Sequence, residues 1–503
     1  MDNKLLIGES QLDLDLLSDF LVHKPKCYLS DGGRQKIQAC RDFLDDKVER
    51  SEAPLYGITT GFGSLCNRSI SSSDLSTLQS NLIKSHACSC ANEVDPDIIR
   101  LMLLLKAHAL SLGYSGVQVT TVERILDLLN ADVLPVVYDM GSLGASGDLA
   151  PLANLFLPLI GEGEVYYHGD KREAAGVLKE LGLEPLTLKS KEGLALLNGT
   201  QFMSSHAVYA LIRARKLMRA ATVIGTLSLE AFDGLDAPFT AELHEVRPHP
   251  GQQVVSETVR ELLSGSELQS HPKSQVQDPY SFRCIPQVHG ATYDTITYVT
   301  SVVEREINSV TDNPTIFSSL DRVISGGNFH GQPLALVCDF LAIAMAELGN
   351  ISERRVAQLI LGNRGLPEFL VAKPGLNSGL MIPQYADAAL VSRNKMYCYS
   401  ASSDSIVSSN GQEDHVSMGA NAATKLMPLL SNLEIILGIE LINAAQALDL
   451  MDRSSKTSTP LRTLHDDFRE RVPMIGDDLV MYKLIQDAAD FIRNYDFSSL
   501  PKA

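Results

Sequence analysis

The segment from residue 425 to residue 451 constrains the fold more than any other part of the chain. Its apolar positions at helical spacing are Leu426, Leu429, Leu430, Leu433, Leu437, Leu441, Ala444 and Leu448. Isoleucines occupy the other faces, so the predicted helix is apolar nearly all round and has to lie deep in a helical bundle. Glu434, Glu440 and Asn443 interrupt the apolar run, which argues against a membrane span.

Three further segments, 98–112, 206–232 and 333–361, show the same helical spacing of apolar residues. Turn-rich stretches separate these segments from one another. We therefore predict a mainly α protein, with a smaller mixed N-terminal domain over residues 1–200 and a long helical bundle over residues 201–503.

The composition indicates which kinds of binding partner and which cellular compartment to expect. With 45% hydrophobic and 21% charged residues, the chain resembles an ordinary soluble globular protein. A net charge of −18 argues against nucleic acid as a partner, because phosphate binding needs clustered Lys and Arg. No apolar run reaches membrane-spanning length without a polar interruption, so we expect no membrane partner. The start of the chain lacks a signal-peptide pattern and the eight cysteines lack disulfide-framework spacing, so we expect a cytoplasmic protein.

The tripeptide Ala145-Ser146-Gly147 can become a carbon electrophile. If the amide nitrogen of Gly147 attacks the carbonyl of Ala145, a five-membered ring forms. Loss of water there, and of a second water from the Ser146 side chain, leaves a methylidene-imidazolone. Ordinary side chains supply nucleophiles, acids and bases, whereas a carbon electrophile otherwise comes from a cofactor. The alternative is a turn of small residues before a helix that Asp148 caps.

Seven motifs follow one another along nearly the whole chain. They are YGITTGFG at 56–63, GSLGASGDLAPLAN at 141–154, NGTQ at 198–201, QDPYSFRC at 277–284, TDNP at 311–314, GGNFHG at 326–331 and QEDHVSMG at 412–419. In this order they resemble the motifs of the aromatic amino acid ammonia-lyases, which include histidine, phenylalanine and tyrosine lyases and related aminomutases. The resemblance implies a mostly α fold and a methylidene-imidazolone formed from Ala145, Ser146 and Gly147, with no exogenous cofactor and no metal. It also implies a homotetramer whose active sites combine loops of three subunits.

Removing ammonia from an α-amino acid takes a proton from a β-carbon that is not acidic, so the reaction needs a strong base. By resemblance, Tyr56 is this base. A phenol has a reference pKa of about 10, so the phenolate has to be stabilised for work near neutrality. Asn198 is expected to donate to the imidazolone oxygen, where negative charge develops as the amine adds.

Three residues near one motif are expected to hold the substrate. Arg283 is the predicted carboxylate clamp, because a planar guanidinium pairs with a carboxylate through two hydrogen bonds. Tyr280 and Gln277 can bond the substrate or the imidazolone oxygen, with a structural role as an equal alternative for Gln277. Phe329 is expected to pack beside the prosthetic ring, and its alternative role is simple core packing.

His86 and Glu413 bear on the choice of substrate. A histidine at position 86 can exchange a hydrogen bond with a polar ring, although some tyrosine-specific members also carry one there. Glu413 stands where phenylalanine and tyrosine lyases usually lack glutamate. A carboxylate can accept from an imidazole N–H, whereas a phenyl ring would leave it unsatisfied. The alternative for Glu413 is a solvated surface residue.

We therefore expect a lyase that converts L-histidine to trans-urocanate and ammonia, the first step of histidine degradation. A tyrosine or phenylalanine lyase or an aminomutase is the alternative, because all share the same adduct.

Two places depart from the family pattern. Ala87-Cys88-Ser89-Cys90 replaces a glycine-bearing stretch that commonly follows the histidine, and Asn154 replaces a histidine often found after the Ala-Ser-Gly signature. His86 with the two cysteines does not predict zinc, because no fourth ligand stands at metal-site spacing.

Overall fold

The computed structural model describes residues 4–50, 57–61, 70–71 and 74–500. It divides into two compact units. The first comprises residues 1–209, 300–339 and 400–424, and the second comprises residues 210–299, 340–399 and 425–503. The predicted boundary near residue 200 lies close to the division at residue 209, and two later segments also belong to the first unit.

The first unit is mixed, with short helices and short strands. Its helices are α1 (Leu14–His23), α2 (Asp31–Arg50), α3 (Leu75–His86), α4 (Pro96–Ser111), α5 (Val119–Asn130), α6 (Leu149–Phe156), α7 (Ala174–Glu180), α8 (Glu192–Leu197) and α16 (Gly419–Thr424). Its strands are β1 (Lys4–Ile7), β2 (Lys26–Leu29), β3 (Cys90–Glu93), β4 (Leu134–Pro135), β5 (Tyr138–Met140), β6 (Glu164–Tyr167), β7 (Asp170–Glu173), β8 (Thr315–Phe317) and β9 (Arg322–Ile324).

The strands form small separate sheets around the helices. β1 pairs in parallel with β2, in the register Lys4 to Lys26. β4, β6 and β7 form a three-stranded antiparallel sheet, while β3 pairs with β5 and β8 pairs with β9. The β3–β5 pair matters for the site, because β5 leads directly into the Ala145-Ser146-Gly147 loop.

Helix α4 forms the centre of this unit and contacts α2 and α5. Its start is defined by Pro96 in the first turn and by the Asp95 side chain, which accepts from the Asp97 amide. Every residue from Ile98 to Ser111 is buried. Polar side chains in this helix therefore need internal partners.

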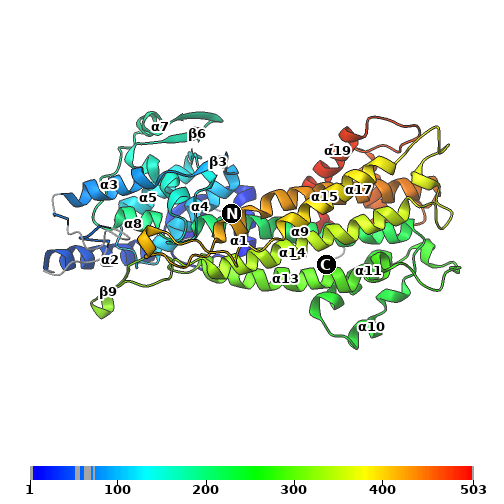
Figure 1. Ribbon diagram of the computed structural model, residues 1–503, viewed down its shortest axis with the longest axis horizontal. Helices are drawn as coiled ribbons and strands as arrows, with labels where there is room; N and C mark the ends of the chain where they lie inside the picture. Colours follow the sequence, from blue (N-terminus) through cyan, green and yellow to red (C-terminus); the bar gives the residue numbers. More distant parts are fainter. Residues whose placement is uncertain (1–3, 51–56, 62–69, 72–73, 501–503) are drawn as a thin grey trace. The chain divides into compact units, whose positions relative to one another are not determined.

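The second unit is helical. Its helices are α10 (Ala241–Glu245), α11 (Pro250–Leu263), α12 (Tyr280–Arg283), α15 (Met381–Tyr397), α17 (Leu426–Leu450), α18 (Thr459–Arg469) and α19 (Met481–Asn494). Three long helices contribute residues to both units, namely α9 (Gln201–Ala231), α13 (Ile285–Ile307) and α14 (Gln332–Leu359). Within the second unit the long helices run alongside one another as a bundle (Figure 1).

The predicted helices are confirmed. α17 packs between α15 and α19 and is buried continuously from Ile436 to Leu448. Glu440 is tolerated inside it because the guanidinium of Arg355 pairs with it, Nε to Oε1 over 2.5 Å, and both side chains are fully buried.

Two stretches, Gln332–Leu359 and Gly419–Leu450, are long and apolar enough to cross a membrane by length and composition alone. This qualifies the expectation that no apolar run reaches that length. In each stretch 72% of the most apolar window is buried inside the structure, as in core helices.

Candidate active site

Ala145, Ser146 and Gly147 lie in the loop between β5 and α6, and the geometry described is that of these encoded residues. Gly147 has φ +75°, and a Cβ there would lie 2.0 Å from the carbonyl oxygen of Gly199. Gly144 has φ +68°, and a Cβ there would lie 2.1 Å from Ser417 Oγ. Both positions require glycine, because the backbone is left-handed and a neighbouring segment is in close contact.

The loop is held against the segment that follows α8. The Asp148 amide donates to the Gly199 carbonyl over 2.8 Å, and the Gly199 amide donates to the Ser146 carbonyl over 3.4 Å. On the other side, the Met418 amide donates to the Leu143 carbonyl over 3.0 Å. Three motifs that are far apart in sequence therefore meet at the tripeptide.

Asp148 connects this loop to the start of α9. Its buried carboxylate accepts from Ser142 Oγ over 2.9 Å and from the Met203 amide over 3.0 Å. Burial raises the pKa of Asp148 to about 7, and these hydrogen bonds oppose that shift. The side chain makes no capping bond to α6, so the interpretation of Asp148 as a cap of the following helix is wrong. Its oxygens accept instead from first-turn amides of α9.

Glu413 lies beside the tripeptide. Its Oε1 accepts from Ser146 Oγ over 3.4 Å, and its Oε2 accepts from Ser408 Oγ over 2.6 Å. Backbone hydrogen bonds between Ser408 and Glu413 hold the two residues in an isolated antiparallel bridge. Glu413 is half-buried, so it is not the solvated surface residue of the alternative interpretation.

His86 ends α3 and is also half-buried. Its Nδ1 lies 3.0 Å from Ser85 Oγ. Burial lowers the pKa of His86, while the Leu82 carbonyl and the charge of Glu413 oppose this shift. The negative charge of Glu413 therefore stabilises the protonated form of His86.

The loop that precedes α14 carries Phe329, which is half-buried. The neighbouring His330 stacks on His415, with ring centroids 5.7 Å apart. Asn313 also holds this loop in place, because its Oδ1 accepts from the Gly326 amide over 2.7 Å. The Phe329 loop and the Glu413 segment are thus in contact.

Asn198 is buried, and its Oδ1 has no hydrogen-bond partner among the residues that the structure describes. The described fold therefore leaves this acceptor oxygen unused, which is unusual for a buried polar atom. The serine leaving group and the two close glycine contacts together fit a prosthetic ring formed at residues 145–147. Within the described ranges, no cluster of His, Cys, Asp or Glu is suited to a metal ion.

Sequence reasoning missed two polar residues of this region, Lys106 and Ser408. Lys106 Nζ donates to the Asn198 carbonyl over 2.5 Å and to Gln201 Oε1 over 3.1 Å. A usable signal existed for Lys106, because it is a charged residue inside an apolar helix. Ser408 lies outside every motif, and only its contact with Glu413 reveals it.

The remaining predicted residues are Tyr56 and three residues of the second unit. Tyr56 falls outside the described residues; after it, the Gly57 amide donates to Thr60 Oγ1 over 3.1 Å. Gln277, Tyr280 and Arg283 belong to the second unit, where Gln277 is exposed. The Arg283 guanidinium lies over the Tyr280 ring, 4.5 Å from its centroid. Arg283 Nε is buried without a partner in the described structure, so this guanidinium keeps an unused donor.

Comparison with known families matches residues 12–470 to the family described as aromatic amino acid lyase. The chain belongs to the aromatic amino acid lyase family. Among proteins of this family, histidine ammonia-lyase of Deinococcus radiodurans is 47% identical over 477 residues, covering 94% of this chain and 90% of that protein.

Solved structures of aromatic amino acid lyases and related enzymes share the fold. Histidine ammonia-lyase from Trypanosoma cruzi has a TM-score of 0.90 at 40% identity, covering 97% of this chain and 93% of that one. Tyrosine aminomutase from Streptomyces globisporus has a TM-score of 0.93 at 34% identity, covering 99% and 98%. As an aromatic amino acid lyase, the protein is a carbon–nitrogen lyase that acts on a small molecule.

Proposed function

We propose that the protein is a histidine ammonia-lyase, which converts L-histidine to trans-urocanate and ammonia without oxidation. The observation that carries the proposal is the position of Glu413, whose carboxylate lies against Ser146 and acts on the charge of His86. A histidine substrate offers an imidazole N–H to such a carboxylate, whereas a phenyl ring would leave it unsatisfied. The 47% identity to a histidine ammonia-lyase supports the same substrate.

The methylidene-imidazolone formed from Ala145, Ser146 and Gly147 would supply the electrophilic carbon that makes the amine a leaving group. Asn198 would donate its amide N–H to the ring oxygen. Glu413 and His86 would hold the imidazole of the substrate.

The other proposed roles concern the substrate backbone. Arg283 would bind the carboxylate through two hydrogen bonds, with Tyr280 and Gln277 as further donors. Tyr56 would take the β-proton, and the stacked position of Tyr280 under Arg283 would keep that guanidinium oriented. Phe329 would pack beside the prosthetic ring and exclude water from it.

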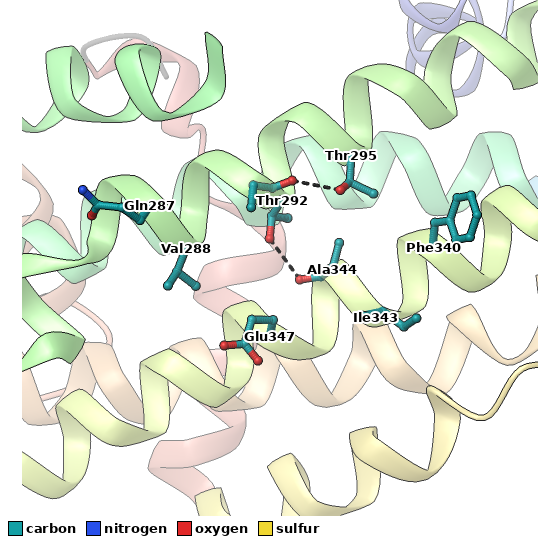
Figure 2. Close-up of a pocket in the computed structure, with 9 residues that line it drawn as sticks. Gln287, Val288, Thr292, Thr295, Phe340, Ile343, Ala344 and Glu347 are labelled. Atoms are coloured by element: carbon teal, nitrogen blue, oxygen red, sulfur yellow. Dashed lines mark hydrogen bonds between the residues drawn. The ribbon is translucent and has the colours of Figure 1, made fainter. Parts of the chain in front are cut away.

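We further infer a homotetramer with shared active sites. An exposed groove of about 480 Å³ supports an interface on the second unit, between α13 and α14 (Figure 2). Val288 and Thr292 line one side, and Phe340 and Ile343 line the other; these last two are 41% and 53% exposed. Apolar side chains that line one groove, rather than being scattered singly, are typical of a surface that another chain covers.

We infer a cytoplasmic localisation as well. No disulfide joins the seven cysteines within the described ranges, which agrees with a reducing compartment.

Incubation with L-histidine, L-tyrosine and L-phenylalanine, in separate reactions, tests the proposal. We expect urocanate and free ammonia from histidine, with much slower turnover of the other two. A preference for tyrosine, or a β-amino acid as the main product, would overturn it in favour of a tyrosine lyase or an aminomutase. Intact-mass measurement tests the prosthetic group separately: the parent should be lighter than its sequence by two waters, and Ser146→Ala should lack that deficit and the activity.

A further inference from the structure

Lys106 is a buried ammonium group to which the proposed mechanism gives no role. It lies in the middle of α4 and is 1% exposed. Burying a cation is costly unless the structure supplies partners. Its hydrogen-bond partners in the described structure are the Asn198 carbonyl, at 2.5 Å, and Gln201 Oε1, at 3.1 Å. The nearby Lys191 differs, because it is paired with Asp312 over 2.8 Å.

The residue that follows Asn198, Gly199, contacts the tripeptide directly. Gly199 has φ +117°, and it forms a parallel bridge with Gly147. Its carbonyl accepts from the Asp148 amide over 2.8 Å, and its amide donates to the Ser146 carbonyl. A Cβ on Gly147 would lie 2.0 Å from the Gly199 oxygen, so the backbone of Gly199 packs directly against the tripeptide.

We propose that Lys106 is a positioning residue that holds Asn198 and Gly199 against Ser146 and Gly147, and that this contact is required for the tripeptide to cyclise. The inference rests on the proposed function, because it concerns formation of the same prosthetic group. The ring closes when the Gly147 nitrogen bonds to the Ala145 carbonyl carbon. The carbonyl oxygen then leaves as water with the Gly147 and Ser146 amide protons, and the Ser146 hydroxyl leaves as a second water with the Ser146 α-proton.

Cyclisation of this kind needs a nitrogen and a carbonyl carbon of one tripeptide at close range, which an extended backbone does not provide. Gly199 donates one hydrogen bond to the loop and accepts another, which together with the left-handed Gly147 keep the loop from being extended. Gly199 is held in turn through Asn198. Burial lowers the pKa of Lys106 to about 7, while Asp312 and Asp148 oppose the shift. An ammonium and a neutral amine both carry N–H groups, so the bond to Asn198 does not depend on charge.

Lys106→Met tests the proposal, because methionine keeps the volume of the side chain and removes its donors. The matched control is Lys191→Met, which removes an equally buried amine that contacts Asp312 and not Asn198. The readout is the ratio of cyclised to uncyclised chains by intact mass, at matched times after expression. Melting temperature and circular dichroism report folding independently of this ratio.

We expect Lys106→Met to lower this ratio by roughly 3- to 15-fold, the factor carried by a lost hydrogen bond that does not depend on charge. Lys191→Met should melt earlier than the parent yet lose both waters completely. Equal cyclisation of Lys106→Met and the parent would overturn the proposal and give Lys106 a merely structural role.

If Lys106→Met does not fold, Lys106→Gln decides the question, because its shorter amide cannot keep the 2.5 Å contact. Its uncyclised fraction has to exceed that of Lys191→Met, and equal fractions would overturn the proposal. A parent that shows no mass deficit would instead contradict the proposed function, which keeps the two failures distinct.

Discussion

The hydroxyl of Ser89 donates a hydrogen bond to Asn154 Oδ1 over 2.8 Å, and the Ser89 amide donates to the same oxygen over 3.3 Å. Ser89 is buried just after His86, and Asn154 lies in α6, which follows the Ala145-Ser146-Gly147 loop. The two departures from the family pattern therefore contact each other, and Asn154 holds in place the stretch that follows His86 in sequence. This gives the Ala87-Cys88-Ser89-Cys90 stretch a structural role.

Asn154→Ala should destabilise the protein by about 1–3 kcal/mol, because it leaves two buried donors of Ser89 unsatisfied. The Ser89→Ala, Asn154→Ala double variant should be little worse than Asn154→Ala alone, since both changes remove the same contact. Denaturation curves of the four proteins provide the test. Asn92→Ala is the control, because Asn92 makes comparable bonds to Asp139 in an exposed place, and its effect should be smaller. If the losses in free energy of unfolding of the two single variants simply add in the double variant, Ser89 and Asn154 do not stabilise the protein through their mutual contact.

Glu413→Gln should lower kcat/KM for histidine by roughly 10- to 150-fold, the value of a lost charge-assisted hydrogen bond. Activity on phenylalanine or tyrosine should fall much less, because those rings have no N–H to offer. Steady-state kinetics on the three amino acids measure this difference. An equal loss on all three would mean that Glu413 acts on something other than the imidazole.

Ser408→Ala should reproduce part of the Glu413→Gln effect. The Ser408 hydroxyl orients the Glu413 carboxylate over 2.6 Å, and its removal frees the side chain to turn without removing its charge. We expect kcat/KM for histidine to fall by roughly 3- to 15-fold, less than for Glu413→Gln because the carboxylate keeps its charge and loses only its orientation. Ser408→Thr keeps the hydroxyl and should restore most of the activity. Ser409→Ala, at the adjacent position, is the control and should behave like the parent.

His206 should make the protein sensitive to acid. This histidine in α9 is fully buried with Nδ1 2.8 Å from the Phe202 carbonyl, and burial lowers its pKa from 6.5 to about 4. A lowered histidine pKa means that the folded state resists a proton that the unfolded chain accepts. Stability is therefore full above pH 6.5 and is lost as the pH falls toward about 4.

When the His206 contribution is lost completely, the free energy of unfolding falls by about 3 kcal/mol. His206→Gln should remove this part of the pH dependence, which urea denaturation at several pH values between about 7 and 4 would reveal. His23→Gln, at the exposed end of α1, is the control because its ring stays in water on folding. If the parent and His206→Gln lost stability in parallel, the ring of His206 would not resist protonation in the fold.

Much of the fold follows from local patterns. The spacing of leucines predicts α17, and similar spacing predicts α4, α9 and α14, because each helix buries a continuous apolar surface and periodicity records which side chains are buried. The position of the electrophile also follows from the sequence, since three adjacent residues contain every atom that the ring needs. The pairing of Glu413 with the tripeptide agrees with its motif, but the motif does not say which oxygen meets which hydroxyl.

The sequence by itself determined the helices, the family motifs and the residues able to form the electrophile. Only the tertiary structure decided that Asp148 bonds to α9, that Ser408 holds Glu413, and that Lys106 contacts Asn198 across 92 residues of sequence. Helical periodicity and ring chemistry involve atoms within a few residues of one another, so the sequence encodes them directly. A hydrogen bond between distant segments depends on the path of the whole backbone and on which buried donors remain to be satisfied.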